Sequence, residues 1–317
     1  MTGPSGELFR RHPSNPILTA DDWPTTVNAV FNPAAVVVDG VTVLLARVEA
    51  RSGISHLTVA RSANGIDGWN VEAEPLLAPL DGKEEEQWGF EDARAVWVDE
   101  LDRHVVTCTA YGPAGPAVFL ATTRDFSSVE RIGIAITPED KNAALLPERV
   151  GGDWILLHRP TSRFAASRAG ISLSRSSDLR SWNPPEVVMQ PREGAWWDSL
   201  RIGIGPPVLK TEHGWLLVYH GVKETIGGGI YRVGLALLDL DDPTRVLRRT
   251  ANWVLAPREP YEREGDVPNA IFPCGMTHDP EADELRLYYG ASDTTICLAS
   301  ASLHDVLETV LAAPAVA

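Results

Sequence analysis

The chain has 317 residues, of which 44% are hydrophobic and 22% are charged, a composition typical of globular proteins rather than of disordered chains. Its formal net charge of -15 disfavours nucleic acid as a partner, because a phosphate backbone requires a basic surface. No apolar run approaches the roughly 20 residues that span a bilayer, and the polar residues 1–11 lack the apolar stretch of a secretory signal.

Three cysteines, Cys108, Cys274 and Cys297, each lie in an apolar, strand-like run without metal-ligand spacing. We expect three buried, reduced thiols in a cytoplasmic protein.

Short β-branched runs separated by Gly, Pro, Asn and Asp recur along the chain and predict an all-β protein: a sandwich, a barrel or a propeller. In each repeat, one run follows a polar loop, a second ends in a polar or aromatic cluster, and a third leads into a Ser/Asp turn. The second runs are residues 43–48, 105–111, 154–160, 215–221 and 285–290. The third runs are residues 56–62, 117–123, 170–176, 233–240 and 296–300. Only residues 302–312 have helical spacing, and they predict a terminal packing helix.

Five such units of about 50 to 65 residues match the repeat length of propeller blades. Blades packed around an axis bury their faces against each other, whereas a sandwich would not require five copies. We therefore predict one five-bladed β-propeller over residues 1–317, without an internal domain boundary. Because a propeller gathers its loops around the mouth of its central channel, residues at equivalent positions of the repeat should converge.

Three classes of side chain stand at these equivalent positions. The acidic class is Glu91, Asp92 and Asp293. The cationic class is Arg47, Lys141, Arg159, Arg201 and His220. The aromatic class, suited to stacking on sugar faces, is Tyr111, Trp196, Trp197, Tyr219, Tyr231 and Tyr289.

Asp92 lies in an apolar collar formed by residues 90–93, and desolvation there should raise the pKa of its carboxyl group. A raised pKa suits a general acid that stays protonated near neutral pH. Alternatively, Asp92 pairs with Arg94 and only ties one blade to the next. Glu91 is adjacent in the strand, so it should point to the opposite face and have a structural role.

The cations lie in or beside apolar strands and therefore need anionic partners. Ordinary carboxylates would serve for any single one of them. Together they could hold an oxyanion such as phosphate, with arginine supplying forked contacts. The chain has no glycine-rich nucleotide loop and no histidine pair at metal-ligand spacing, so we predict no metal site, although a propeller can hold an axial metal without a motif.

Five short motifs, in this order and spacing, resemble glycoside hydrolase family 130, the five-bladed propellers that include β-mannoside phosphorylases. The resemblance runs from residue 15 to residue 293. The motifs are Phe-Asn-Pro-Ala at 31–34, Gly-Phe-Glu-Asp-Ala-Arg at 89–94, His-Arg-Pro at 158–160, Tyr-His-Gly-Val at 219–222 and Leu-Leu-Asp-Leu-Asp-Asp-Pro at 237–243.

The resemblance implies a role for each matching residue. Asp92 looks like the general acid, whose proton would pass through the mannosyl 3-hydroxyl to the glycosidic oxygen. The residues implied in phosphate binding are Lys141, Asn142, Arg159, Arg201 and His220. Asn32, Arg47 and Asp293 resemble residues that hold the mannosyl unit, and Tyr231 is the aromatic residue that we assign to substrate binding. Lys141 and Arg201 exchange one basic residue for another relative to other members, which changes their hydrogen-bond geometry.

The implied reaction is inverting phosphorolysis of β-1,2- or β-1,4-linked manno-oligosaccharides to α-mannose 1-phosphate. Inorganic phosphate would be the co-substrate, with no cofactor. The first alternative is an inverting β-1,2-mannosidase of the same family, in which the phosphate cage is replaced and glutamates serve as the base. A non-catalytic glycan-binding propeller is the second. We expect acceptor choice in loops 193–199 and 223–232, and a homo-oligomer is plausible.

Overall fold

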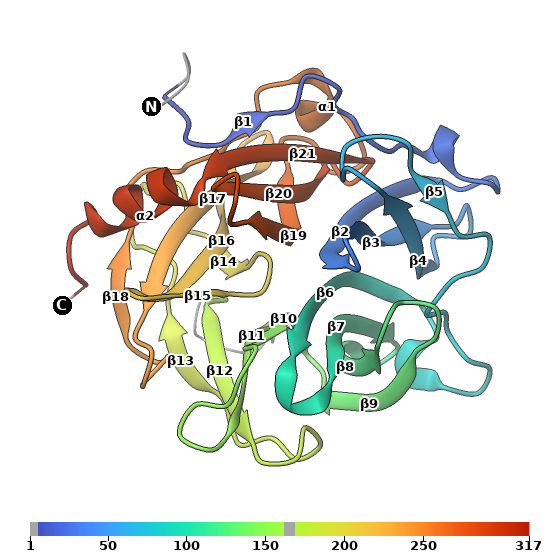
Figure 1. The fold of residues 1–317 in the computed structure, drawn as a ribbon, viewed down its shortest axis with the longest axis horizontal. Coiled ribbons are helices and arrows are strands. Elements are labelled where there is room, and N and C mark those ends of the chain that lie inside the picture. Colours follow the sequence, from blue (N-terminus) through green and yellow to red (C-terminus); the bar gives the residue numbers. More distant parts are fainter. Residues whose placement is uncertain (1–5, 162–168, 317) are drawn as a thin grey trace.

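Five small antiparallel sheets form a ring around a central axis in a computed structural model that describes residues 6–161 and 169–316 (Figure 1). The predicted five-bladed β-propeller is confirmed. Each predicted second or third run overlaps the second or third strand of a blade. The innermost strands β2, β6, β10, β14 and β19 surround the axis, and each blade is built outward from its innermost strand.

The strands divide among the blades as follows. Blade one contains β2 (Ala29–Val38), β3 (Val41–Glu49), β4 (Ser55–Ser62) and β5 (Asn70–Val71). Blade two contains β6 (Phe90–Val98), β7 (Arg103–Gly112), β8 (Gly115–Thr123) and β9 (Glu130–Ile136). Blade three contains β10 (Asp140–Leu145), β11 (Trp154–Pro160), β12 (Ile171–Ser176) and β13 (Glu186–Met189). Blade four contains β14 (Arg201–Ile204), β16 (Gly214–Thr225), β17 (Gly228–Leu238) and β18 (Val246–Arg249), with β15 (Leu209–Thr211) paired to β16. Blade five contains β19 (Ile271–Asp279), β20 (Glu284–Ala291), β21 (Thr295–Ser302) and β1 (Arg10–Arg11).

Helices are short and peripheral. The described residues form α1 (Pro260–Arg263), α2 (Leu303–Leu311) and three 3-10 turns at Ala20–Asp22, Glu84–Glu86 and Asp99–Leu101. The helix α2 confirms the predicted terminal helix. It begins at the N-cap Ser302, whose side chain accepts a hydrogen bond from the Asp305 N–H, and it buries Val306 and Val310.

The innermost strands of the first three blades each carry a β-bulge at the same place. Strand pairing shifts between Phe31 and Ala34 in β2, between Glu91 and Arg94 in β6, and between Lys141 and Ala144 in β10. Inside each bulge one polar residue adopts a positive φ: 47° at Asn32, 53° at Asp92 and 55° at Asn142. A bulge interrupts the alternation of side chains and changes the direction of the extra residue. The repeat therefore brings three polar side chains to the axis.

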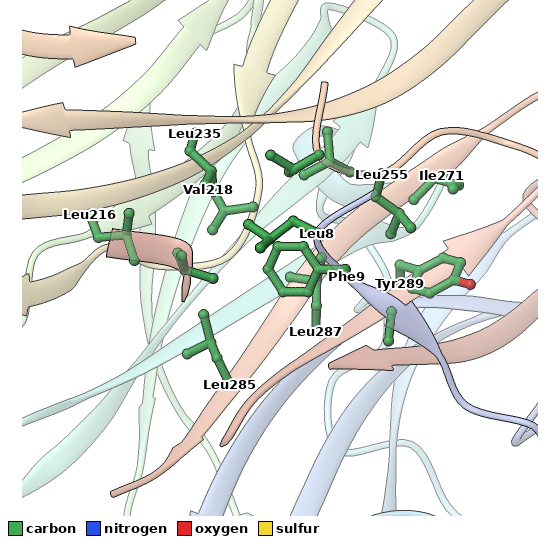
Figure 2. Packing of buried hydrophobic residues seen from close by; sticks show 14 of the residues in the cluster. Leu8, Phe9, Leu216, Val218, Leu235, Leu255, Ile271, Leu285, Leu287 and Tyr289 are labelled. Atoms are coloured by element: carbon green, nitrogen blue, oxygen red, sulfur yellow. The ribbon is translucent and has the colours of Figure 1, made fainter. Parts of the chain in front are cut away.

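The N-terminal segment closes the ring. β1 pairs with β21, so that Arg10 lies opposite Ser300 and Arg11 opposite Ala299. Figure 2 shows Leu8 and Phe9 at the centre of a cluster that also contains Val218 and Leu235 of blade four and Leu285 and Leu287 of blade five. Burial of each of these two side chains contributes about 1.5–3 kcal/mol.

A buried ion-pair network also connects the N-terminal segment to α1 and to β20. Arg11 contacts Glu262 Oε1 through Nε at 2.7 Å and Glu7 Oε2 through Nη1 at 2.8 Å. The Glu262 side chain is fully buried, and the Tyr289 hydroxyl donates to its Oε1 at 2.8 Å.

We predict that Arg11→Ala lowers the free energy of unfolding by about 3–5 kcal/mol, because it leaves the Glu262 carboxylate buried without its cation. Urea titration measures this change. The matched control is Arg245→Ala, whose arginine is 66% exposed in its pair with Asp239, and for which we expect a change within about 0.5 kcal/mol. Equal losses in the two variants would contradict a role in closure.

Candidate active site

A cavity of about 270 Å³ lies at the axis, and all five blades contribute to it. Ten residues were assigned from the sequence to catalysis, phosphate binding or substrate binding, and all of them line this cavity: Asn32, Arg47, Asp92, Lys141, Asn142, Arg159, Arg201, His220, Tyr231 and Asp293. Glu91, Val267, Ala270 and Phe272 complete the lining. The structure thus brings together residues that are up to 261 positions apart, from Asn32 to Asp293 (293 − 32 = 261).

The Asp92 carboxylate has two polar partners at one oxygen. Its Oδ1 accepts from Asn32 Nδ2 at 2.8 Å and from Arg47 Nη1 at 3.3 Å. Arg94 instead binds backbone carbonyls: that of Asp92 at 2.6 Å, and those of Ile204 and Gly205, in blade four, at 3.1 and 2.9 Å. Arg94 therefore ties blade two to blade four across the axis, and it hydrogen-bonds the main chain of Asp92 rather than its carboxylate.

The predicted increase in the pKa of Asp92 is wrong. Burial raises the pKa, but the charges of Arg47, Lys141 and Arg94 and the hydrogen bond from Asn32 together hold it below its usual value. The raised pKa is that of Asp293, which reaches about 7 because of burial and because of the negative charge of Asp92. The pKa values of these two neighbouring carboxyl groups therefore shift in opposite directions, so that Asp92 is ionised and Asp293 stays protonated up to near-neutral pH.

Glu91 also lies in the cavity, which corrects the prediction that it points to the opposite face. Regular strand alternation would separate neighbours, but the bulge at Asp92 interrupts that alternation. Glu91 Oε1 lies 3.1 Å from Arg47 Nη2, and its Oε2 accepts from Lys141 Nζ at 3.4 Å. Glu91 therefore bridges the two cations at this end of the cavity.

The other end of the cavity is rich in unused hydrogen-bonding capacity. Several buried polar atoms have no hydrogen-bond partner of ordinary geometry within residues 6–161 and 169–316: Arg159 Nε, both amide atoms of Asn142 and both ring nitrogens of His220. Arg201 Nη2 donates to the Tyr231 hydroxyl at 2.5 Å. Since an unpartnered buried donor costs free energy, this cluster favours a ligand with several acceptor oxygens.

Electrostatics at this end also favour an anion. Burial and the charge of Arg201 lower the pKa of Arg159 to about 10. Burial and the charges of Arg159 and Arg94 lower the pKa of His220 well below its usual value, so His220 is neutral rather than cationic, which corrects its predicted class. A bound anion would relieve the repulsion between Arg159 and Arg201.

Two glycines, Gly290 and Gly203, leave room for the side chains of Asn32 and His220. A Cβ atom at Gly290 would collide with Asn32 Oδ1, and one at Gly203 would collide with the His220 ring. Phe272, which the sequence analysis missed, packs its ring 4.5 Å from that of His220. Phe272 lies at the start of β19, which is equivalent in the repeat to the position of the Phe-Asn-Pro-Ala motif in blade one. This equivalence could have identified Phe272 from the sequence.

Most of the aromatic side chains do not face the cavity as predicted. Only Tyr231 of the six lines it. Tyr219 and Tyr289 are fully buried, and the Trp197 ring stacks on Tyr219 at 5.6 Å. These side chains fill the space between blades, because alternate residues of a blade strand face the neighbouring blades.

The described residues contain neither a cluster of metal ligands nor a membrane-spanning helix. No group of three His, Cys, Asp or Glu side chains within 6–161 and 169–316 is arranged to hold a metal ion. No helix in the same residues is long and apolar enough to cross a membrane. Cys108, Cys274 and Cys297 are buried free thiols.

Comparison with known proteins shows likeness along the whole chain. Residues 9–311 match a family model described as beta-1,4-mannooligosaccharide phosphorylase. The Beta-1,4-mannooligosaccharide phosphorylase of Ruminococcus albus is 32% identical over 312 residues, which cover 96% of this chain and 91% of that protein. The Beta-1,2-mannobiose phosphorylase of Listeria innocua is 35% identical over 264 residues, which cover 83% and 71%. A solved structure of the Listeria innocua Beta-1,2-Mannobiose phosphorylase with beta-1,2-mannobiose has a TM-score of 0.87 at 28% identity, covering 96% of this chain and 99% of that one.

The raised pKa of Asp293 predicts a pH-dependent stability. Between about pH 4 and 7 the folded protein binds more protons at this carboxyl than the unfolded chain does, so its contribution to stability falls as the pH rises through that window. Asparagine resembles the protonated acid. We therefore expect the melting temperature of Asp293→Asn, relative to the unchanged protein, to be higher at about pH 8 than at about pH 5. A difference that does not vary with pH would contradict the assignment.

Proposed function

The chain belongs to glycoside hydrolase family 130, and from this premise we infer that it catalyses the inverting phosphorolysis of β-mannosides. The observation that carries the inference is the buried cluster of unused donors at Arg159, Asn142 and His220. An inverting hydrolase needs a second carboxylate to activate water. Besides Asp92, two carboxyl groups of the described residues line the cavity. That of Glu91 is engaged at both oxygens by cations, and that of Asp293, whose pKa is raised to about 7, is the group that we assign to the mannosyl unit.

In the proposed reaction, phosphate is the nucleophile. Lys141, Asn142, Arg159, Arg201 and His220 would hold it, with neutral His220 donating one hydrogen bond. A phosphate oxygen forms a bond to the anomeric carbon from the face opposite the leaving group while the glycosidic C–O bond breaks. The proton of Asp92 passes through the mannosyl 3-hydroxyl to the leaving oxygen. The products are α-mannose 1-phosphate and a glycan shortened by one unit or a free sugar. Positioning and charge neutralisation supply most of the acceleration.

Asp92 must be protonated when the reaction begins, although the charges around it hold its pKa below its usual value. Phosphate binding would offset the charge of Lys141, which is one of the cations that lower the pKa of Asp92. Sugar binding would also exclude water from the carboxylate. Both changes raise the pKa of Asp92, so its carboxylate would take up a proton from solvent as the two substrates bind and would then act as the acid.

The sugar would lie at the opposite end of the cavity. Asn32, Arg47 and Asp293 would hold the mannosyl unit, and Tyr231 would lie between sugar and phosphate. Loops 193–199 and 223–232 would select the acceptor, and hence β-1,2 or β-1,4 linkage. We also propose a cytoplasmic location, in keeping with the three free, buried thiols. A homo-oligomer is the proposed assembly.

The synthetic direction tests activity and acceptor together. With α-mannose 1-phosphate and mannose, glucose, N-acetylglucosamine or a mannobiose, we expect phosphate release with at least one acceptor. Asp92→Asn should lower that rate by about 10²–10⁴-fold, the contribution of a general acid. Hydrolysis of β-mannobiosides at full rate without phosphate would favour the mannosidase, and glycan binding without turnover would favour a non-catalytic propeller.

Arg159→Ala tests the phosphate site separately. A hydrogen bond to a charged group contributes about 1.5–3 kcal/mol, so we expect the KM for phosphate to rise roughly 10- to 100-fold. The KM for the mannoside should change much less. Arg61→Ala is the control, because Arg61 pairs with Glu72 on the surface. An unchanged KM for phosphate in Arg159→Ala would exclude Arg159 from the phosphate site.

A further inference from the structure

A second hollow, of about 440 Å³, lies on blade four and is separated from the cavity by β17. Its main side chains are Trp196, Lys223, Arg232, Asn252 and Trp253. Arg232 directly follows Tyr231 in β17, and consecutive strand residues point to opposite faces. Tyr231 accordingly lines the cavity, whereas Arg232 lines the hollow.

Two tryptophan rings in this hollow are exposed to solvent. Trp196 is 44% exposed and Trp253 is 38% exposed, whereas the core residues Trp154 and Trp215 are 1% exposed. The Trp253 ring is fixed in place, because it lies edge-on to Trp197 at 6.5 Å and under the Arg232 guanidinium at 4.6 Å. The Trp196 ring lies under the Arg192 guanidinium at 4.9 Å, so an arginine packs on each of the two rings while the rest of the ring surface faces solvent. Exposed aromatic side chains held in place by neighbours are a common feature of binding surfaces.

The guanidinium of Arg232 has unused hydrogen-bonding capacity. Its Nε and Nη1 are buried without a hydrogen-bond partner among the described residues. Burial lowers the pKa of Arg232, as expected for a cation without a carboxylate beside it. Lys223 Nζ donates to the Ala195 carbonyl at 3.1 Å, which connects the hairpin of β16 and β17 to loop 193–199. The hollow thus combines fixed aromatic faces with a donor that lacks an acceptor.

We propose that this hollow binds a pyranose unit of a longer β-mannan chain, an inference that rests on the proposed function. A pyranose ring has apolar C–H faces that pack on tryptophan and hydroxyl oxygens that accept from a guanidinium. A simple anion would leave the Trp253 and Trp196 faces exposed. A purely apolar group would leave Arg232 without an acceptor. A sugar satisfies both parts of the surface.

The hollow would increase the affinity of the enzyme for long glycans and would leave the rate of the chemical step unchanged. A glycan long enough to contact it while its end lies in the cavity gains a second contact, and a disaccharide does not. The hollow therefore distinguishes substrates by chain length.

The test compares a β-linked mannobiose with a β-linked mannohexaose as substrates of Trp253→Ala. We expect the KM for the hexasaccharide to rise roughly five- to tenfold, the size of one lost aromatic contact, and the KM for the disaccharide to stay unchanged. Trp253→Phe should retain most of the affinity. Trp97→Ala is the matched control, because Trp97 is also 38% exposed but lies on blade two. Equal effects on both substrates, or none on either, would overturn the proposal.

A binding experiment keeps this test separate from the proposed function. Calorimetry with mannohexaose and the inactive Asp92→Asn protein requires no turnover. Adding Trp253→Ala should weaken that binding by the same factor, and an unchanged affinity would refute the hollow. Absence of phosphate release from the unchanged enzyme would count against the proposed function alone.

Discussion

In the first three blades, the innermost strand leaves regular pairing at one polar residue in a left-handed conformation. Asn32, Asp92 and Asn142 occupy these three positions. A regular strand would direct neighbouring side chains to opposite faces and so into the packing between blades. The bulge directs them to the axis instead, and it brings Glu91 to the same cavity as Asp92. The steric cost of a left-handed asparagine or aspartate is small, so the repeat places polar groups at the axis with little strain.

The cavity that results has two electrostatically different ends. At one end, Glu91, Asp92 and Asn32 contact Arg47 and Lys141, so most charged groups there already have a partner of opposite charge within the protein. At the other end, the side chains of Arg159, Asn142 and His220 have unused hydrogen-bonding capacity. A preorganised cluster of this kind binds an anion without first breaking internal contacts. The proposed sites for the nucleophile and the acid thus differ in how many of their hydrogen-bonding groups already have partners within the protein.

Sequence repeats predicted the propeller and part of the cavity lining, because both depend on equivalent positions within a repeat, whereas Asn32 and Asn142 were assigned through the family resemblance. The side-chain direction of Glu91 could not be predicted, since a bulge is a property of the pairing between β6 and β7. The pKa of Asp92 was predicted wrongly because an apolar collar was visible in the sequence, whereas the converging charges of Arg47 and Lys141 come from other blades. Tyr219 and Tyr289 were assigned to sugar stacking because composition does not distinguish a face between blades from one at the axis.

The pairing of β1 with β21 joins residue 10 to residue 300, so a segment that precedes blade one in the chain becomes part of blade five. Until β21 has left the ribosome, Leu8 and Phe9 lack part of the blade-five surface that covers them in the finished ring. Blades one to four can form from contacts local in sequence, but the last blade requires a contact of very high sequence separation. Closure of the ring therefore depends on a pairing between distant parts of the chain, and a change that weakens β1 or β21 would affect the axial cavity without touching a residue that lines it.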